Sequence, residues 1–252
     1  MSAERFDRLD ALRALAIVWM VAFHFGFDLN HFDLLDPRQN FHRDLLWTLQ
    51  RACIVSLFLF CAGLGQAVAL QAGLDGRRFS PSVRPSFSPN FWRRWAQVAG
   101  CAVVVSLGSA WMFPGSWIYF GVLHGIAVML IMCRLVAPLR GWLWPLGALA
   151  VLLPRVLQLP LFDHPALNWV GLVTHKPLTE DYVPVLPWLG VMLWGLAAGQ
   201  WLLQHRRSVL SAPLPAVLQP MAVLGRWSLS LYMLHQPVLI GALMAGRSMG
   251  WW

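Results

Sequence analysis

The sequence predicts an all-α, multi-pass membrane protein with about seven transmembrane helices. Of its 252 residues, 58% are hydrophobic and only 12% are charged, and this charged fraction is about half that of an ordinary soluble domain. Mostly apolar runs of about 18 or more residues, enough to cross a bilayer core as a helix, recur along the chain. No soluble domain and no long linker is visible, so we expect a single transmembrane domain over residues 1–252.

The first expected helix follows a charged stretch and covers residues 11–30. It resembles a signal peptide, but His24 and Asp28 interrupt its far end and no small-residue cleavage site follows, so we expect it to be retained. The tight turn at Pro114-Gly115 makes the third and fourth helices antiparallel neighbours. Pro154 interrupts the end of the fifth. The later helices are expected at residues 46–71, 95–113, 117–136, 142–160, 184–203 and 222–245.

Orientation is predicted from the basic residues. The chain carries 19 Lys and Arg against 11 Asp and Glu, a net charge of +8. Most of these cations fall on one side when the N-terminus is placed in the cytoplasm and the C-terminus outside. In a membrane protein such an excess indicates topology and lipid headgroups and does not favour nucleic acid as a partner. The four cysteines lie in apolar segments, where we expect small buried side chains and no disulfides.

Two kinds of loop connect the helices. The cytoplasmic loop from Asp75 to Arg94 contains five arginines, which suit anionic lipid or an anionic cofactor. The outer loops 31–45 and 161–183 are the longest on their side and are expected to form a lid or a substrate cleft. Their histidines are His31, His42, His164 and His175.

A polar stripe on the first helix is the strongest functional signal. Because a helix turns about 100° per residue, Arg13, His24, Asp28 and His31 share one face of an otherwise apolar segment. Lipid does not solvate such groups, so the stripe must face protein or water. His24 and Asp28 are an i, i+4 pair, in which the carboxylate is expected either to orient the imidazole as a general base or to form a structural ion pair.

Two further histidines are predicted to lie at the same depth. At a rise of about 1.5 Å per residue, His24, His124 and His235 all fall roughly 20 Å from the inner surface, on three different helices. A packing role remains open for each histidine, and so does a metal or haem held by the three. Gln236 follows His235 and precedes Pro237, which either frees backbone carbonyls for binding or simply kinks the helix.

The inner ends of the helices carry candidate phosphate-binding residues. Arg13 lies about 16 Å from His24 along the helix, too far for contact but suited to a long ligand whose phosphates stay at the cytoplasmic mouth. Arg93 and Arg94 begin the third helix at the same level. For these arginines the positive-inside rule alone is the alternative explanation.

The chain also resembles a known family. The ordered segments RLDALRALA (8–16), FHF (23–25), SLFLFCAGL (56–64), FGVLHG (120–125), DYVPVLPWLG (181–190) and GRWSLSLYMLHQP (225–237) are similar to the bacterial heparan-alpha-glucosaminide N-acetyltransferase catalytic-domain family. The spacing of Arg13 and His24 also resembles the Arg-x10-His signature of the wider membrane acyltransferase superfamily. Ala14 stands where the family usually has Gly. The lysosomal relatives carry Asn where His24 falls and a nucleophilic His later, nearer His31 or beyond, so both histidines remain candidates.

The resemblance implies a multi-pass enzyme of the bacterial inner membrane that moves an acetyl group from cytoplasmic acetyl-CoA to a sugar amine or hydroxyl on the far side, with no metal. It implies that His24, oriented by Asp28, deprotonates a glycan or glycolipid acceptor or carries the acetyl group. His124 and His235 would hold the acceptor or polarise the thioester. The phosphates would lie near Arg13, Arg93 and Arg94, and the acceptor near His31, Asp181 and Gln236. Oligomeric state is not predicted.

Two other classes of protein use similar residues. A proton-coupled transporter also places His, Asp and Arg inside the membrane, although no internal repeat of the transporter kind is visible. A haem- or metal-binding membrane protein would use the histidine layer as ligands. Substrate flux without acetyl-CoA would indicate the first, and a haem absorbance band or stoichiometric metal the second.

Overall fold

The computed structural model describes residues 6–41, 43–72 and 87–251, and within these ranges all regular structure is helical. Arg5, His42, Arg77, Arg78 and Arg84 therefore lie outside the described residues. Among the described residues, six helical runs are long and apolar enough to cross a membrane. The predicted class of all-α multi-pass membrane protein is confirmed, while the direction of insertion stays a prediction.

The chain folds as two compact units, and the single domain expected over residues 1–252 stays a prediction. One unit contains Leu59–Ala212, and the other contains Phe6–Phe58 with the chain from Pro213 onward. Helix α2 (Leu45–Ala72) contributes its first half to the second unit and its last half to the first.

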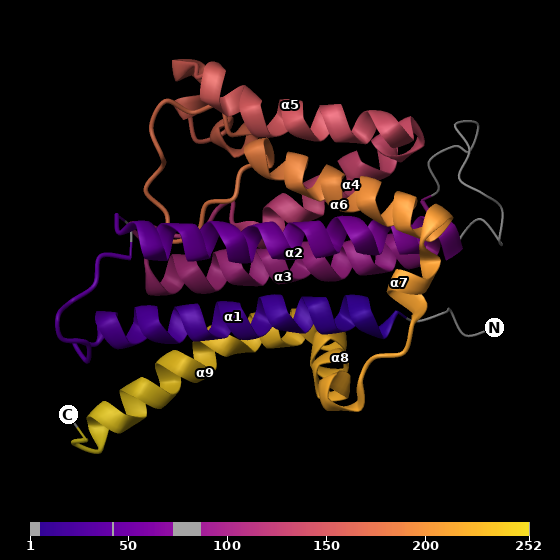
Figure 1. Ribbon diagram of the computed structural model, residues 1–252. Coiled ribbons are helices and arrows are strands. Elements are labelled where there is room, and N and C mark those ends of the chain that lie inside the picture. Colours follow the sequence, from indigo (N-terminus) through magenta and orange to yellow (C-terminus); the bar gives the residue numbers. More distant parts are fainter. Residues whose placement is uncertain (1–5, 42, 73–86, 252) are drawn as a thin grey trace. The chain divides into compact units, whose positions relative to one another are not determined.

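The unit that contains the N-terminal helix is built around α1 (Asp7–His31). Helices α8 (Gln219–Arg226) and α9 (Ser228–Ser248) both pack against α1 (Figure 1). Its buried core consists of Ile17, Met20, Phe23, Phe41 and Ile54. Asp7 and Asp10 lie in the first turn of α1, where carboxylates are favourable to the helix dipole. This unit therefore packs α8 and α9, which follow one another late in the chain, against the helix that carries the polar stripe.

The predicted helix 222–245 is two helices. It breaks at Trp227, where α8 ends and α9 begins. Trp227 has φ −99° and ψ 16°, outside the regular helical range, and its N–H still bonds the carbonyl of Leu224 at 3.0 Å. The hydrophobic run alone gave no sign of this break, because an apolar run does not show a change of helix direction. Helix α9 then continues through Pro237.

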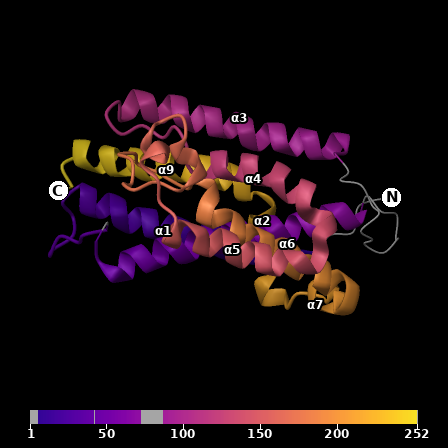
Figure 2. The ribbon, with the colours of Figure 1, turned by 90° about the horizontal axis from the view of Figure 1, so that it is seen from above.

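The other unit is a set of helices around α6 (Val185–His205). Helices α5 (Leu143–Val156) and α6 lie side by side in both views (Figures 1 and 2). Helix α3 (Pro89–Met112) packs on α4 (Val122–Val136) and begins at Ser88, whose hydroxyl accepts the N–H of Phe91 at 3.3 Å. Short segments complete the unit: η1 (Ala137–Trp142), η2 (Pro160–Asp163), η3 (Asn168–Val170) and α7 (Arg207–Ser211), while η4 (Ala216–Leu218) belongs to the other unit.

The fourth and fifth expected helices form one helical run, Val122–Val156, which accounts for six candidate spans instead of seven. Helices α4 and α5 have 15 and 14 residues. Each is therefore about 22 Å long, less than the roughly 30 Å hydrocarbon core. The η1 segment between them contains Arg140 at φ 49°, which interrupts the α-helical geometry.

The connection between α5 and α6 is a folded segment. The N–H of Glu180 bonds the carbonyl of Ser116 at 2.9 Å, and the hydroxyl of Thr179 bonds the carbonyl of Trp117 at 2.8 Å. Earlier in the segment, Asp163 accepts hydrogen bonds from the hydroxyl of Thr174 and from the N–H of Thr174, the latter at 2.7 Å. These hydrogen bonds hold the pKa of Asp163 below its ordinary value, and the bond from the Thr174 hydroxyl has the largest effect. The loop expected over 161–183 is thus tied to the start of α4.

Candidate functional site

A histidine pair lies at the centre of the α1 stripe. His24 Nδ1 on α1 is 2.7 Å from His235 Nε2 on α9, and both residues belong to the same compact unit. The two ring planes are 15° apart with centroids 4.9 Å apart. At this separation the rings are joined by a short nitrogen–nitrogen hydrogen bond. The structure therefore joins two of the three predicted histidines directly.

The second nitrogen of each histidine has a different environment. His235 Nδ1 lies 2.6 Å from the backbone carbonyl oxygen of Tyr232, one turn earlier on α9. His24 Nε2 has no hydrogen-bond partner among residues 6–41, 43–72 and 87–251. The pair is thus anchored to the backbone at one end and open at the other.

Asp28 and Gln236 form a second pair, one turn further along α1. Asp28 is buried, with 3% of its surface exposed, and its Oδ1 accepts a 3.3 Å hydrogen bond from Gln236 Nε2. In the described part of the chain, Asp28 Oδ2 and Gln236 Oε1 are buried acceptors without a partner. Buried polar groups are normally paired, so two unmatched acceptors mark a place for a molecule that donates hydrogen bonds.

The expected hydrogen bond between Asp28 and His24 is absent from the described residues. Asp28 bonds Gln236, and His24 bonds His235. The physical reason is that α9 presents adjacent residues, His235 and Gln236, to two successive turns of α1. The long-range partners replace the i, i+4 contact that the spacing along one helix suggested.

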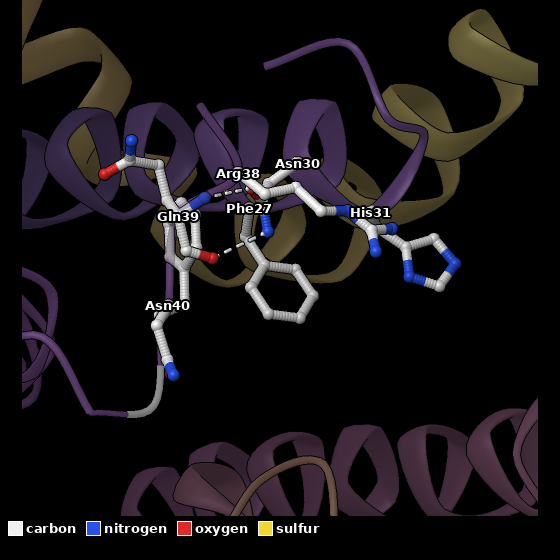
Figure 3. A pocket seen from close by; sticks show the side chains of 7 residues that line it. Phe27, Asn30, His31, Arg38, Gln39 and Asn40 are labelled. Atoms are coloured by element: carbon white, nitrogen blue, oxygen red, sulfur yellow. Dashed lines mark hydrogen bonds between the residues drawn. The ribbon is translucent and has the colours of Figure 1, made fainter. Parts of the chain in front are cut away.

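A cleft of about 440 Å³ opens at the end of α1, beside His31 (Figure 3). Asn30 holds its wall in place, because its side chain bonds the backbone of Gln39 twice, at 3.0 Å through Nδ2 and at 2.7 Å through Oδ1. The lining residues are Phe27, Asn30, His31, Arg38, Gln39, Asn40 and Phe41. The expectation that loop 31–45 forms a cleft agrees with this geometry. Amide and aromatic side chains in such a cleft suit a polar organic ligand.

Arg13 is held in a charge network at the other end of α1. Its guanidinium bonds Asp10 at 2.8 Å, and Arg226 on α8 bonds Asp7 at 2.9 Å and lies 4.0 Å from Asp10. A Cβ on Gly225 would lie 1.7 Å from the carbonyl oxygen of Asp10, so α8 touches the α1 backbone here. Arg13 is therefore matched by carboxylates, whereas Arg93 and Arg94 are exposed in the first turns of α3.

His124 and Asp181 meet in the other compact unit, at the start of α4. Asp181 Oδ2 accepts the N–H of Val122 at 2.7 Å, and a Cβ on Gly121 would lie 2.3 Å from that oxygen. His124 Nδ1 accepts the N–H of Gly121 at 3.3 Å. Asp181 thus supplies the helix cap that Gly121, without a side chain, lacks.

Both ring nitrogens of His124 are engaged. Its Nε2 lies 3.0 Å from the hydroxyl of Ser106, which itself donates to the carbonyl of Ile118 at 2.7 Å. Because the hydroxyl proton is used, His124 Nε2–H donates to Ser106. This network ties α3 to the segment before α4. The expectation that His124 lies in one layer with His24 and His235 stays a prediction.

Some polar residues of the site gave no signal in the sequence. Asn168 is buried, donates from Nδ2 to the Tyr119 hydroxyl at 2.6 Å, and accepts at its carbonyl from the Tyr182 hydroxyl at 2.6 Å. Burial raises the pKa of both tyrosines. Tyr182 lies in an outer loop whose aromatic and polar residues could contact a sugar, whereas Asn168 and Tyr119 lie in segments without a periodic pattern, so only a family alignment or a structure would reveal them. In the described ranges no three His, Cys, Asp or Glu side chains are grouped as metal ligands.

Comparison with known proteins gives one family. Residues 5–237 match the model of the heparan-alpha-glucosaminide N-acetyltransferase catalytic family. The matched range contains the histidine pair, the cleft and every site residue predicted from the sequence. Searches of curated proteins and of solved structures gave no match.

Proposed function

The chain belongs to the heparan-alpha-glucosaminide N-acetyltransferase catalytic family, a family of membrane acetyltransferases, and from this membership we propose how it works. The donor is acetyl-CoA from the cytoplasm, and the acceptor is an amine or hydroxyl of a sugar on the far side of the membrane. The family name points to an alpha-glucosaminide as the acceptor to try first. The membrane is proposed to be the bacterial inner membrane.

The His24–His235 pair is the observation that supports this proposal. Acetyl transfer needs a base that removes a proton from the attacking amine or hydroxyl, or a nucleophile that carries the acetyl group. An imidazole with one free nitrogen and a partner on the other meets both needs. His24 has this arrangement, whereas both nitrogens of His124 are occupied. We therefore assign the chemical step to His24 and leave His124 a positioning role.

Two routes are consistent with this assignment. In direct transfer, His24 takes the acceptor's proton as the acceptor attacks the thioester carbon. The carbon–sulfur bond then breaks, and the proton passes from His24 to the departing CoA thiolate. In the alternative, His24 Nε2 attacks the thioester carbon, the carbon–sulfur bond breaks, and CoA leaves as its thiolate, which gives an acetyl-imidazolium. The acceptor then attacks the acetyl carbon, the carbon–nitrogen bond breaks to restore the neutral imidazole, and the acceptor's proton passes to the CoA thiolate. Both routes are balanced in atoms and charge.

Asp28 and Gln236 are proposed to hold the acceptor group. Their unmatched oxygens accept hydrogen bonds, as an amine or hydroxyl requires, and they lie one turn from His24 on α1 and adjacent to His235 on α9. The cleft beside His31 would receive the rest of the sugar. In this assignment His31 binds the acceptor, because it lines the cleft and is exposed at the helix end.

The donor's phosphates are proposed to bind Arg93 and Arg94, which are both exposed residues. Arg13 contributes less, because Asp10 already neutralises it at 2.8 Å. Asp181 is proposed to act on acceptor binding indirectly, because it holds the start of α4 in place through the Val122 N–H.

Reconstituted vesicles test the proposal. The full chain is inserted into sealed liposomes, acetyl-CoA labelled in the acetyl group is supplied on one side, and a chromogenic alpha-glucosaminide on the other. We expect labelled N-acetyl product on the acceptor side and none with protein-free liposomes. Labelled product only when donor and acceptor share one side would refute transfer across the membrane, and no product from any acceptor would refute the activity.

A further inference from the structure

The hydrogen-bond chain through the histidine pair has a direction. It runs from His24 Nδ1 to His235 Nε2 over 2.7 Å, and from His235 Nδ1 to the carbonyl of Tyr232 over 2.6 Å. A backbone carbonyl accepts hydrogen bonds but does not donate them. The proton in the second bond therefore belongs to His235 Nδ1.

The position of that proton determines the others in the neutral pair. A neutral imidazole has one N–H, so His235 Nε2 is an acceptor when Nδ1 carries the hydrogen. The hydrogen in the bond between the rings then comes from His24 Nδ1. His24 in turn is neutral with a bare Nε2, the atom that has no partner among the described residues.

We infer that His24 Nε2 is the reacting nitrogen and that His235 is a positioning residue that selects it. This inference rests on the proposed acetyl transfer, and it adds the atom that reacts and the residue that determines it. His235 takes the place that a carboxylate has in a catalytic triad, because it holds the reacting histidine in one tautomer and orientation.

The pair also has a single entry for a further proton. Both bridging positions are occupied by one hydrogen each, and the carbonyl of Tyr232 closes the far end. A proton taken from the acceptor therefore binds His24 Nε2. The hydrogen on His24 Nδ1 can then move to His235 Nε2, which leaves His24 neutral and His235 as the imidazolium. Returning the proton to the CoA thiolate reverses both movements, so the pair ends as it began.

The other ionisable groups nearby do not provide this arrangement. Asp28 on α1 bonds Gln236 and does not reach His24. His31 lies at the exposed end of α1. The ring of Tyr232 on α9 is 5.7 Å from the His235 ring, and its backbone carbonyl bonds His235.

Nitrogen NMR of the full chain in lipid nanodiscs tests the inference without any substrate. With ¹⁵N-labelled histidine, the protonated and bare nitrogens of a neutral imidazole have distinct resonances, and His24→Ala identifies the signals of His24. We expect a protonated Nδ1 and a bare Nε2 in His24 at a pH where the pair is neutral. A protonated Nε2 in that neutral residue would overturn the inference.

Two variants give the functional readout. His235→Leu removes the acceptor for His24 Nδ1–H, and we expect His24 to lose its single tautomer and kcat to fall roughly 10²–10⁴-fold, with KM changed only a few-fold. His235→Gln keeps an acceptor oxygen and should restore the tautomer and part of kcat. A normal kcat in His235→Leu would overturn the positioning role. If the wild-type chain transfers no acetyl group, the NMR result still decides the tautomer, so failure of the proposed function is recognised separately.

Discussion

Replacing Asp181 with Ala distinguishes two roles for this carboxylate. The sequence suggested that it binds the acceptor, whereas the structure shows it accepting the Val122 N–H at 2.7 Å at the start of α4. Removing a helix cap costs about 0.5–2 kcal/mol. Losing a negative charge at a helix N-terminus costs about 0.3–1 kcal/mol more. The total loss of stability is therefore about 1–3 kcal/mol. For a chain of this size, each kcal/mol lowers the unfolding midpoint by roughly 2–4 °C.

The assay is thermal unfolding of the purified protein in one detergent, together with KM for the acceptor. Asp181→Asn keeps an acceptor oxygen and should recover most of the loss, and Asp36→Ala, which removes an exposed carboxylate, serves as the control. Gly121→Ala would place a Cβ 2.3 Å from Asp181 Oδ2, so its effect should not add to that of Asp181→Ala. An unchanged midpoint with a raised acceptor KM in Asp181→Ala would refute the capping role and restore the original prediction.

Three further predictions concern other parts of the chain. Because the pKa of Asp163 is lowered in the folded protein, its contribution to stability is present above the ordinary carboxyl value of 3.8 and is lost as pH falls through the lowered value. Amide hydrogen exchange in residues 157–184 should therefore accelerate in that acidic range. An equal acceleration in Asp163→Ala, which lacks the carboxylate, would contradict this role for Asp163. Gly225→Leu should destabilise the protein by about 3 kcal/mol because its side chain meets the α1 backbone, whereas Gly241→Ala, with open space around its Cβ, should have little effect on the unfolding midpoint. Arg94→Gln should raise KM for acetyl-CoA about 2–5-fold at low salt without changing kcat, and an equal change with acetyl-dephospho-CoA would show that Arg94 does not contact the 3′-phosphate.

The sequence predicted the helices well where hydrophobic length decides them. The ends of the helices predicted at 46–71 and 184–203 differ by at most two residues from those of α2 and α6. The break at Trp227 and the short helices α4 and α5 were not predicted, because an apolar run shows neither a change of direction nor a tight connection. His24 and Asp28 of α1 contact the adjacent residues His235 and Gln236 of α9, and the roles assigned to these residues stay predictions.

The partners of those residues were harder to predict. Spacing along α1 favours Asp28 as the partner of His24, but the actual partner is His235, which is 211 positions away in the chain. A pattern within one segment contains no information about which distant segment packs on it. The same holds for Asp181, which caps α4 from 59 residues away. Both contacts depend on tertiary packing, and the sequence contributed only the polar residues themselves.

The central claim, that His24 carries out acetyl transfer, is tested most directly by the kcat of His24→Ala with acetyl-CoA and an alpha-glucosaminide. His205→Ala is the matched control, because His205 is exposed at the end of α6, where its Nδ1 lies 3.1 Å from the Trp201 carbonyl oxygen. We predict that His24→Ala lowers kcat at least about 10²-fold and keeps an unfolding midpoint near that of the wild type. The kcat of His205→Ala should stay near the wild-type value. A kcat for folded His24→Ala within a few-fold of wild type would contradict the assignment of His24 as the reacting residue.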